Sequence, residues 1–167
     1  MPAVVVDTSV LIALAAGEQF GLLKEFYLTI HIPPAVWSEI SASAKPFGLP
    51  ETQQAIKEGW LMVQKPASLA AISPLPFNLQ LGETEALALA LEMTGALLLI
   101  DDAQGRRAAH YLGLHYTGTL GILLRAKTEA RLPQLAPVLQ LLKQRTSFRL
   151  SETVRDAVLR QVGEMPP

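Results

Sequence analysis

Short apolar runs alternate with helix-forming stretches along most of the chain. Val4, Val5 and Val6 form an apolar run without alternation, which is typical of a strand covered on both faces. Because strands that alternate with helices assemble into a parallel sheet through right-handed crossovers, the pattern predicts an α/β fold. The expected strands are 4–6, 27–32, 60–63, 96–100 and 113–117, and the expected helices are 10–15, 18–26, 35–40, 51–58, 81–93, 103–112, 118–127, 133–145 and 151–162.

Two of the apolar runs end on carboxylates. Asp7 directly follows the first run, and Asp101 and Asp102 directly follow the run 96–100. In an open parallel sheet the carboxyl ends of the strands meet at one edge, where ligands bind, so we expect these three acids to lie together. Aspartate is also a good helix cap, as are Thr8 and Ser9, and this structural role is the alternative interpretation.

Two further acids lie in helices that we expect to lean over this edge. Glu39 is in the helix that Pro33-Pro34 opens, and Glu83 is in the first turn of the Ala- and Leu-rich helix 81–93. A helix glutamate is ordinarily a solvated surface residue, and the helix dipole is a sufficient reason for an acid in a first turn. The dipole also favours the ionised carboxylate, which is the form that binds a hard divalent cation.

Length and composition bound the class of protein. At 167 residues, the chain is long enough for one domain with a full core, which we place at 1–167. It has no cysteine, no apolar run that reaches the ~18 residues of a membrane span, and no basic region ahead of an apolar segment at its start. We therefore expect a soluble, cytoplasmic protein without disulfides, thiolate metal sites or a membrane anchor.

The net charge of −1 argues against a protein that coats nucleic acid by bulk electrostatics. The charge is unevenly distributed: residues 1–102 have four Lys/Arg against eleven Asp/Glu, giving −7, and residues 103–167 have ten against four, giving +6. An acidic cation site followed by phosphate-holding side chains fits this distribution, as does ordinary surface variation. Arg106, Arg107 and the helix start at Thr119 are the candidates for holding a phosphate.

The acids also indicate a chemistry for the sheet edge. Four or five carboxylates, with no cysteine and no paired histidines, favour Mg²⁺ or Mn²⁺ over zinc. A divalent cation held by them polarises a phosphoryl oxygen and activates water, which is the equipment for cutting a phosphodiester. Mutual repulsion raises the pKa values of such acids and destabilises the empty site, so we expect metal binding to stabilise the fold.

The chain carries five motifs that together span most of its length: V-V-D-T-S-V-L-I, P-P-A-V-W-S-E-I, L-G-E-T-E-A-L-A-L-A, L-L-I-D-D-A-Q-G-R-R-A-A and G-T-L-G-I-L-L-R-A-K. In this order they resemble the motifs of PIN-domain proteins, specifically VapC-type toxin ribonucleases and a related subgroup of uncharacterised bacterial and archaeal PIN-like proteins. The resemblance implies a three-layer α/β/α fold with a central parallel sheet of four or five strands. It covers residues 1–131, and residues 132–167 form a C-terminal helical extension that fits only the subgroup.

The same resemblance implies a function: a metal-dependent endoribonuclease that cuts single-stranded RNA with Mg²⁺ or Mn²⁺, as the toxin of a toxin–antitoxin pair. It also implies a homodimer, which the Leu-rich stretch 120–124 would suit, and a small antitoxin protein laid over the acidic crevice. The catalytic residues that it implies are Asp7, Glu39, Glu83, Asp101 and Asp102, with Asp7, Glu83, Asp101 and Asp102 as metal ligands and the hydroxyl of Ser9 as a supporting group.

Two other functions remain open from the sequence. The first is a PIN-like fold that has lost catalysis and serves as a binding module. The second is a receiver-type signalling domain, which also binds magnesium through clustered acids. Receivers place an acidic pair after the first strand and a lysine at a late strand end, whereas here the pair follows a late strand and residues 116–118 contain no lysine.

Overall fold

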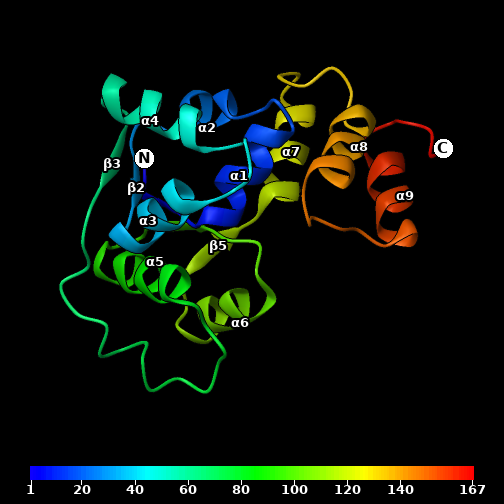
Figure 1. The fold of residues 1–167 in the computed structure, drawn as a ribbon. Helices are drawn as coiled ribbons and strands as arrows, with labels where there is room; N and C mark the ends of the chain where they lie inside the picture. Colours follow the sequence, from blue (N-terminus) through cyan, green and yellow to red (C-terminus); the bar gives the residue numbers. More distant parts are fainter.

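The computed structural model describes residues 1–167 and arranges them in three layers around one sheet (Figure 1). Five parallel strands form this sheet in the order β3-β2-β1-β4-β5, so the predicted α/β/α fold is confirmed. The strands are β1 (Val4–Val6), β2 (Ile30–Ile32), β3 (Leu61–Val63), β4 (Leu97–Leu99) and β5 (His115–Thr117). The helices are α1 (Thr8–Ala16), α2 (Gly21–Phe26), α3 (Pro34–Ala42), α4 (Leu49–Glu58), α5 (Leu81–Glu92), α6 (Ala103–Tyr111), α7 (Thr119–Thr128), α8 (Ala136–Arg145) and α9 (Glu152–Gln161).

Both faces of the sheet are apolar, because successive residues of its central strands point to opposite sides. Val4 and Val6 pack into a core that includes residues of α1, α2, α3, α4, α7, α8 and α9. Val5 packs into a second core with α5 and α6, the green helices in Figure 1. Leu98 and Leu99 of β4 divide between the two cores in the same way. Burial on both faces explains why the strands read as uninterrupted apolar runs.

The C-terminal helices lie at one end of the molecule, where α8 packs against α1 and α9 lies beyond α8 (Figure 1). Leu142 of α8 and Leu159 of α9 are almost completely buried in the larger core. Gly17, at the end of α1, has no side chain, and a Cβ there would lie 3.1 Å from Val138 of α8. The extension therefore shares the core of the sheet domain instead of forming a unit of its own.

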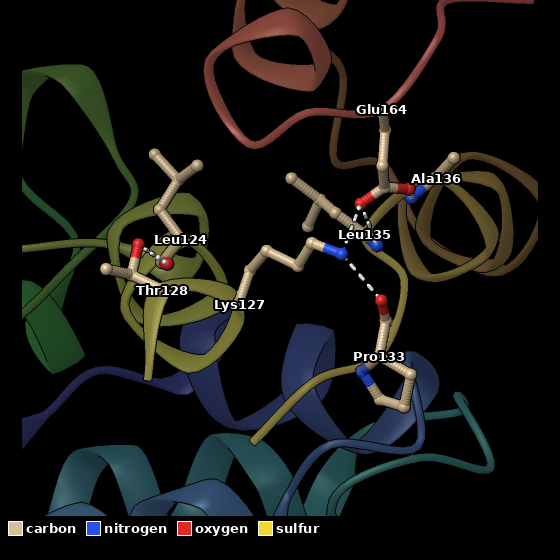
Figure 2. A network of polar contacts seen from close by, with 7 residues as sticks. All are labelled: Leu124, Lys127, Thr128, Pro133, Leu135, Ala136 and Glu164. Carbon is tan, nitrogen blue, oxygen red and sulfur yellow. Dashed lines mark hydrogen bonds and ion pairs between the residues drawn. The ribbon is translucent and has the colours of Figure 1, made fainter. Parts of the chain in front are cut away.

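A polar network fastens this extension at its far end (Figure 2). The carboxylate of Glu164, beyond α9, accepts hydrogen bonds from the N–H groups of Leu135 (2.7 Å) and Ala136 (3.0 Å) at the start of α8. The ammonium group of Lys127 in α7 lies 3.4 Å from the same carboxylate and donates to the carbonyl of Pro133 at 2.6 Å. One acid thus joins the end of α9, the start of α8 and the core helix α7.

Several elements are shorter than the sequence pattern predicts. Glu18 has a left-handed backbone with φ of 60°, so α2 begins only at Gly21 instead of residue 18. The strand expected over 27–32 is limited to β2, because its neighbour β1 has only three residues and pairs with it from Ile30 onward. The expected helix 133–145 likewise begins at Ala136.

The apolar residues of α7 pack mainly within the chain. Ile122 and Leu123 are fully buried in the larger core, and Leu120 and Leu124 are half-buried against it. None of the helices has both the length and the apolarity that a membrane crossing requires.

Candidate active site

Two neighbouring strands bring acids together at the carboxyl edge of the sheet. The N–H of Asp7, the first residue after β1, donates to the carbonyl of Leu99 in β4 at 3.0 Å, and Asp101 follows two residues beyond that carbonyl. β2 and β3 lie on one side of β1, whereas β4 and β5 lie on the other, so the strand order reverses between β1 and β4. This is the position where open α/β sheets form a ligand-binding crevice.

A cavity of about 980 Å³ opens at this edge. Carboxylates reach it from four places in the chain: the end of β1, helix α3, the first turn of α5 and the end of β4. The hydroxyl-bearing Ser9 and the cationic Arg106 also line the cavity, whereas Arg107 is exposed elsewhere on α6. The acids that the structure brings together here are Asp7, Glu39, Glu83, Asp101 and Asp102.

Asp7 is the most buried of these acids, with 4% of its surface exposed. Burial raises the pKa of Asp7 from 3.8 to about 7; a hydrogen bond from the Thr8 N–H opposes the rise, and the charges of Glu83 and Glu39 add to it. The hydroxyl of Ser9 donates a hydrogen bond to Oδ2 of Asp7 at 3.3 Å. Asp7 therefore carries a charge that the fold disfavours, which a nearby cation would stabilise.

Glu39 is held by donors from two other helices. Its Oε2 accepts from the hydroxyl of Thr8 in α1 at 2.6 Å, and its Oε1 accepts from the N–H of Gly82 in α5 at 3.0 Å. In return, Glu85 of α5 accepts from the N–H of Ala35 at the start of α3 at 2.8 Å. Each helix thus offers a carboxylate to a free N–H in the first turn of the other, which fixes α3 and α5 together over the cavity.

Glu83 lies in the first turn of α5, where its Oε2 accepts from the N–H of Gln80 at 2.9 Å. Its other oxygen has no hydrogen bond. Burial raises the pKa of Glu83, and the negative charges of Asp102 and Glu39 raise it further. The hydrogen bond from the Gln80 N–H lowers this pKa but does not cancel the rise. The acids on α3, α5 and the end of β4 therefore repel one another across the cavity.

Asp101 is held entirely by one residue at the start of α7. The N–H of Thr119 donates to Oδ1 at 2.8 Å, and the Thr119 hydroxyl donates to Oδ2 at 2.6 Å. Thr119 is fully buried, and both of these groups are engaged by Asp101. A phosphate contact at Thr119 therefore remains a prediction from the sequence. Gly118 permits this close approach, since a Cβ at that position would collide with Oδ1 of Asp101.

Asp102 begins helix α6, where its Oδ2 accepts from the N–H of Gly105 at 2.8 Å. It therefore has the N-cap role that the sequence left open, while its Oδ1 makes no hydrogen bond. Arg106, one turn along α6, lies over the ring of Tyr116 with its guanidinium carbon 5.5 Å from the ring centre. Arg106 makes no ion pair with any acid of the cavity.

The donor set fits a hard divalent cation by its chemistry, because it consists of carboxylate and hydroxyl oxygens. Asp7, Glu83 and Asp102 each keep an oxygen without a short hydrogen bond, whereas both oxygens of Glu39 and Asp101 are engaged. As the side chains stand, no group of three or more Asp, Glu or His residues is arranged as a metal-ligand cluster. A cation held here therefore requires rotation of at least one carboxylate toward the others.

A family model of PIN domains, DUF3368, matches residues 3–164 of the chain. The protein belongs to this PIN-domain family. Its match includes α8 and α9 as well as the sheet domain. No curated protein matches this PIN domain. Among solved structures, it is similar to a PilT N-terminus domain protein from the hyperthermophilic archaeon Sulfolobus solfataricus P2, at 17% identity and a TM-score of 0.46 over 89% of this chain and 98% of that one.

The cavity of this PIN domain also contains residues that sequence analysis did not select. Thr8 orients Glu39, although its position alone suggested only a helix cap. Lys45, in the loop before α4, and the segment 146–150 between α8 and α9 line the same cavity. One feature of the sequence could have indicated the segment 146–150: it carries a basic residue, Arg149, in the short stretch R-T-S-F-R-L between two predicted helices.

Proposed function

We propose that this PIN domain is a metal-dependent endoribonuclease that cuts single-stranded RNA. The PIN-domain family is one of nuclease-like folds, which supports phosphodiester cleavage as the general class of reaction. The finer statements, that the substrate is single-stranded RNA and the cofactor Mg²⁺ or Mn²⁺, follow the motif resemblance and the oxygen-only donor set.

One observation carries this proposal: five carboxylates from four segments line a single cavity at the switch point of the sheet. Two of them, Asp7 and Glu83, have raised pKa values because they are buried beside other acids. Concentrating like charges in this way destabilises a fold unless a ligand of opposite charge binds there. When bound, a divalent cation supplies charge stabilisation for the phosphoryl group and activates water.

The surrounding donors support a different proposed role for each acid. Asp7, Glu83 and Asp102 would hold the cation, since each keeps an oxygen without a short hydrogen bond. Glu39 and Asp101, which accept from Thr8, Gly82 and Thr119, are fixed in orientation and would complete the set of acids around the cation. Such preset geometry lowers the cost of arranging charges around the reacting phosphate.

Cleavage of single-stranded RNA by the purified protein tests the proposal. Wild type, Asp7→Asn and Asp101→Asn should be purified identically and compared with Mg²⁺, with Mn²⁺ and with EDTA. We expect cutting by wild type alone, and only with a divalent cation. Equal cutting by all three preparations would identify a contaminating ribonuclease, and cutting that persists in EDTA would contradict a metal nuclease.

A non-catalytic RNA-binding module is the second candidate. The observation that favours it is the lack of any three carboxylates arranged as a ligand cluster. The two candidates differ in one measurement, since a binding module retains RNA affinity while no RNA is cut with either metal. A receiver-type domain is disfavoured by the family assignment.

We further propose that the protein is a homodimer and the toxin of a toxin–antitoxin pair, inhibited by a small antitoxin protein whose arginine reaches the carboxylates. Motif resemblance supports both statements. Light scattering at micromolar concentration tests the first, and a monomer would contradict it. Induced expression in a bacterial host tests the second: growth should stop with wild type and continue with Asp7→Asn.

A further inference from the structure

The segment Thr146–Leu150, which connects α8 and α9, forms one wall of the acidic cavity. All five of its residues line that cavity together with the carboxylates of the sheet domain. The C-terminal extension, for which sequence analysis assigns no role, therefore contributes directly to the candidate active site.

This wall is held by hydrogen bonds at its Thr146 end. Thr146 donates its N–H and its hydroxyl to the carbonyl of Leu142, at 3.0 and 2.8 Å, and accepts from the N–H of Phe148 at 3.0 Å. Just before it, the guanidinium of Arg145 donates to the carbonyl of Ala16 in α1 at 2.9 Å. The ring of Phe148 packs against the larger core. The wall thus keeps a defined position relative to the C-terminal end of α1.

Arg149 is the cation of this wall, and its own segment positions it. Its Nη1 donates to the carbonyls of Thr146 at 2.7 Å and Phe148 at 2.8 Å. Its Nε and Nη2 groups have no partner, and no carboxylate pairs with it. A guanidinium fixed on one edge and free on the other is preorganised to bind an anion, because less side-chain entropy is lost on binding.

Two more unpaired cations line the same cavity. Lys45 reaches it from the loop between α3 and α4, and Arg106 reaches it from α6. Neither forms an ion pair, although five carboxylates line the cavity with them. A ligand that fits this arrangement has anionic groups at its periphery and meets the carboxylates through a cation. A phosphodiester strand has this charge pattern, since it carries one anionic group at each nucleotide.

We propose that Thr146–Leu150 is a substrate-binding wall, in which Arg149 binds a phosphate of single-stranded RNA that flanks the phosphate to be cut. Lys45 and Arg106 bind other phosphates of the same strand from the remaining two sides. This inference rests on the proposed function for the identity of its ligand. It assigns to the C-terminal extension the holding of substrate, and no part in the bond-breaking step.

Binding without cleavage tests this wall separately from catalysis. A fluorescein-labelled oligouridylate should be titrated with full-length protein in Ca²⁺, a hard cation that carboxylates hold, at several salt concentrations, with fluorescence anisotropy as the readout. Arg149→Gln removes the charge and retains an amide that can donate to the same carbonyls, so the segment keeps its support. The matched control is Arg160→Gln, since Arg160 is exposed on α9 and lies outside the cavity.

We expect Arg149→Gln to weaken binding roughly tenfold, as the loss of one charge-assisted contact does. The slope of log affinity against log salt should fall by about 0.7, because one phosphate contact to a single strand is lost. Arg160→Gln should change neither quantity. Equal affinities and slopes for the two variants, or wild type that binds no oligouridylate, would overturn the proposal. If RNA binding depends on Arg149 but the protein cuts no RNA, the substrate-binding role of the wall is supported and the proposed nuclease activity is refuted.

Discussion

The carboxylate of Glu39 and the backbone N–H of Gly82 are joined by a hydrogen bond of 3.0 Å, and the glycine has no side chain to hinder it. A Cβ at residue 82 would lie 2.8 Å from the carboxyl carbon of Glu39, closer than real Cβ contacts occur. Any larger residue at this position must therefore displace Glu39 from the donors that orient it.

This contact predicts the effect of Gly82→Ala. Helix propensity alone favours alanine by about 1 kcal/mol, yet we expect RNA cleavage to fall at least tenfold, because the carboxylate moves. The matched control is Gly21→Ala, which also lies in the first turn of a helix but has open space around its missing Cβ. Loss of cleavage in both variants, or in neither, would contradict a specific role of residue 82.

Thr119→Val tests the support of Asp101. The substitution keeps the shape and the backbone N–H of residue 119, but removes the hydroxyl that donates to Oδ2 at 2.6 Å. We expect cleavage to fall and the free energy of unfolding to drop by about 1–2 kcal/mol, since a buried hydrogen bond is lost. Thr128→Val, at the exposed end of the same helix, is the control and should leave cleavage unchanged.

Because of Asp7, we expect the free energy of unfolding to fall as pH rises. Its pKa is raised from 3.8 to about 7 in the folded protein, so folding favours the protonated acid. The resulting destabilisation is absent below pH 3.8, grows between pH 3.8 and 7, and is complete above pH 7, where the shift corresponds to roughly 4 kcal/mol.

Asp7→Asn removes this ionisation and keeps the size of the side chain. Thermal unfolding should give a variant that resembles wild type near pH 4 and is increasingly more stable than wild type toward pH 7. A stability difference that stays constant over this range would show that the charge of Asp7 is not its source.

Divalent cations should stabilise wild type in a way that depends on the same acid. A ligand that binds only the folded state adds about 2.7 kcal/mol at one hundred times its dissociation constant. We expect Mg²⁺ or Mn²⁺ to raise the melting temperature of wild type, and to raise that of Asp7→Asn much less. KCl at matched ionic strength serves as the control, and an equal rise with KCl would indicate screening of the acids instead of binding.

Glu164 predicts an acid-sensitive attachment of the C-terminal helices. Burial raises its pKa, but the N–H groups of Ala136 and Leu135 and the charge of Lys127 outweigh this, so the pKa of Glu164 lies below 4.5. Its stabilising effect is therefore present above pH 4.5 and is lost as pH falls through the lowered folded-state pKa. Glu164→Gln should lower the free energy of unfolding at pH 7 by about 1–2 kcal/mol, whereas exposed Glu152→Gln should change it little. A wild-type unfolding energy that matches that of Glu164→Gln would refute this attachment.

The acids that follow strands could be predicted from sequence because one local pattern suffices. An apolar run followed by Asp7, or by Asp101 and Asp102, indicates both a strand and the edge on which it ends. The supporting contacts could not be predicted in this way. The bond from Thr8 to Glu39 spans 31 residues, and Thr119 contacts Asp101 across 18. Such contacts depend on how the helices cross the sheet, which side-chain periodicity does not specify.

The place of the segment Thr146–Leu150 in the cavity is even harder to predict from the sequence. Thr146–Leu150 reads as an ordinary loop, and its relation to Asp7 arises only because α8 packs on the end of α1. Part of the surface that residues 120–124 pack against is likewise this extension. Contacts between elements distant in the chain account for both outcomes.

Both oxygens of Asp101 depend on Thr119, and Thr119 moves with α7, whose rotation is set by Ile122 and Leu123 in the core. The hydrophobic packing of one helix therefore aims a carboxylate that the packed residues never touch. Substitutions of core residues in α7 will therefore change activity even though these residues do not line the cavity. Variants selected for activity in this protein are at the same time selected for correct packing of α7.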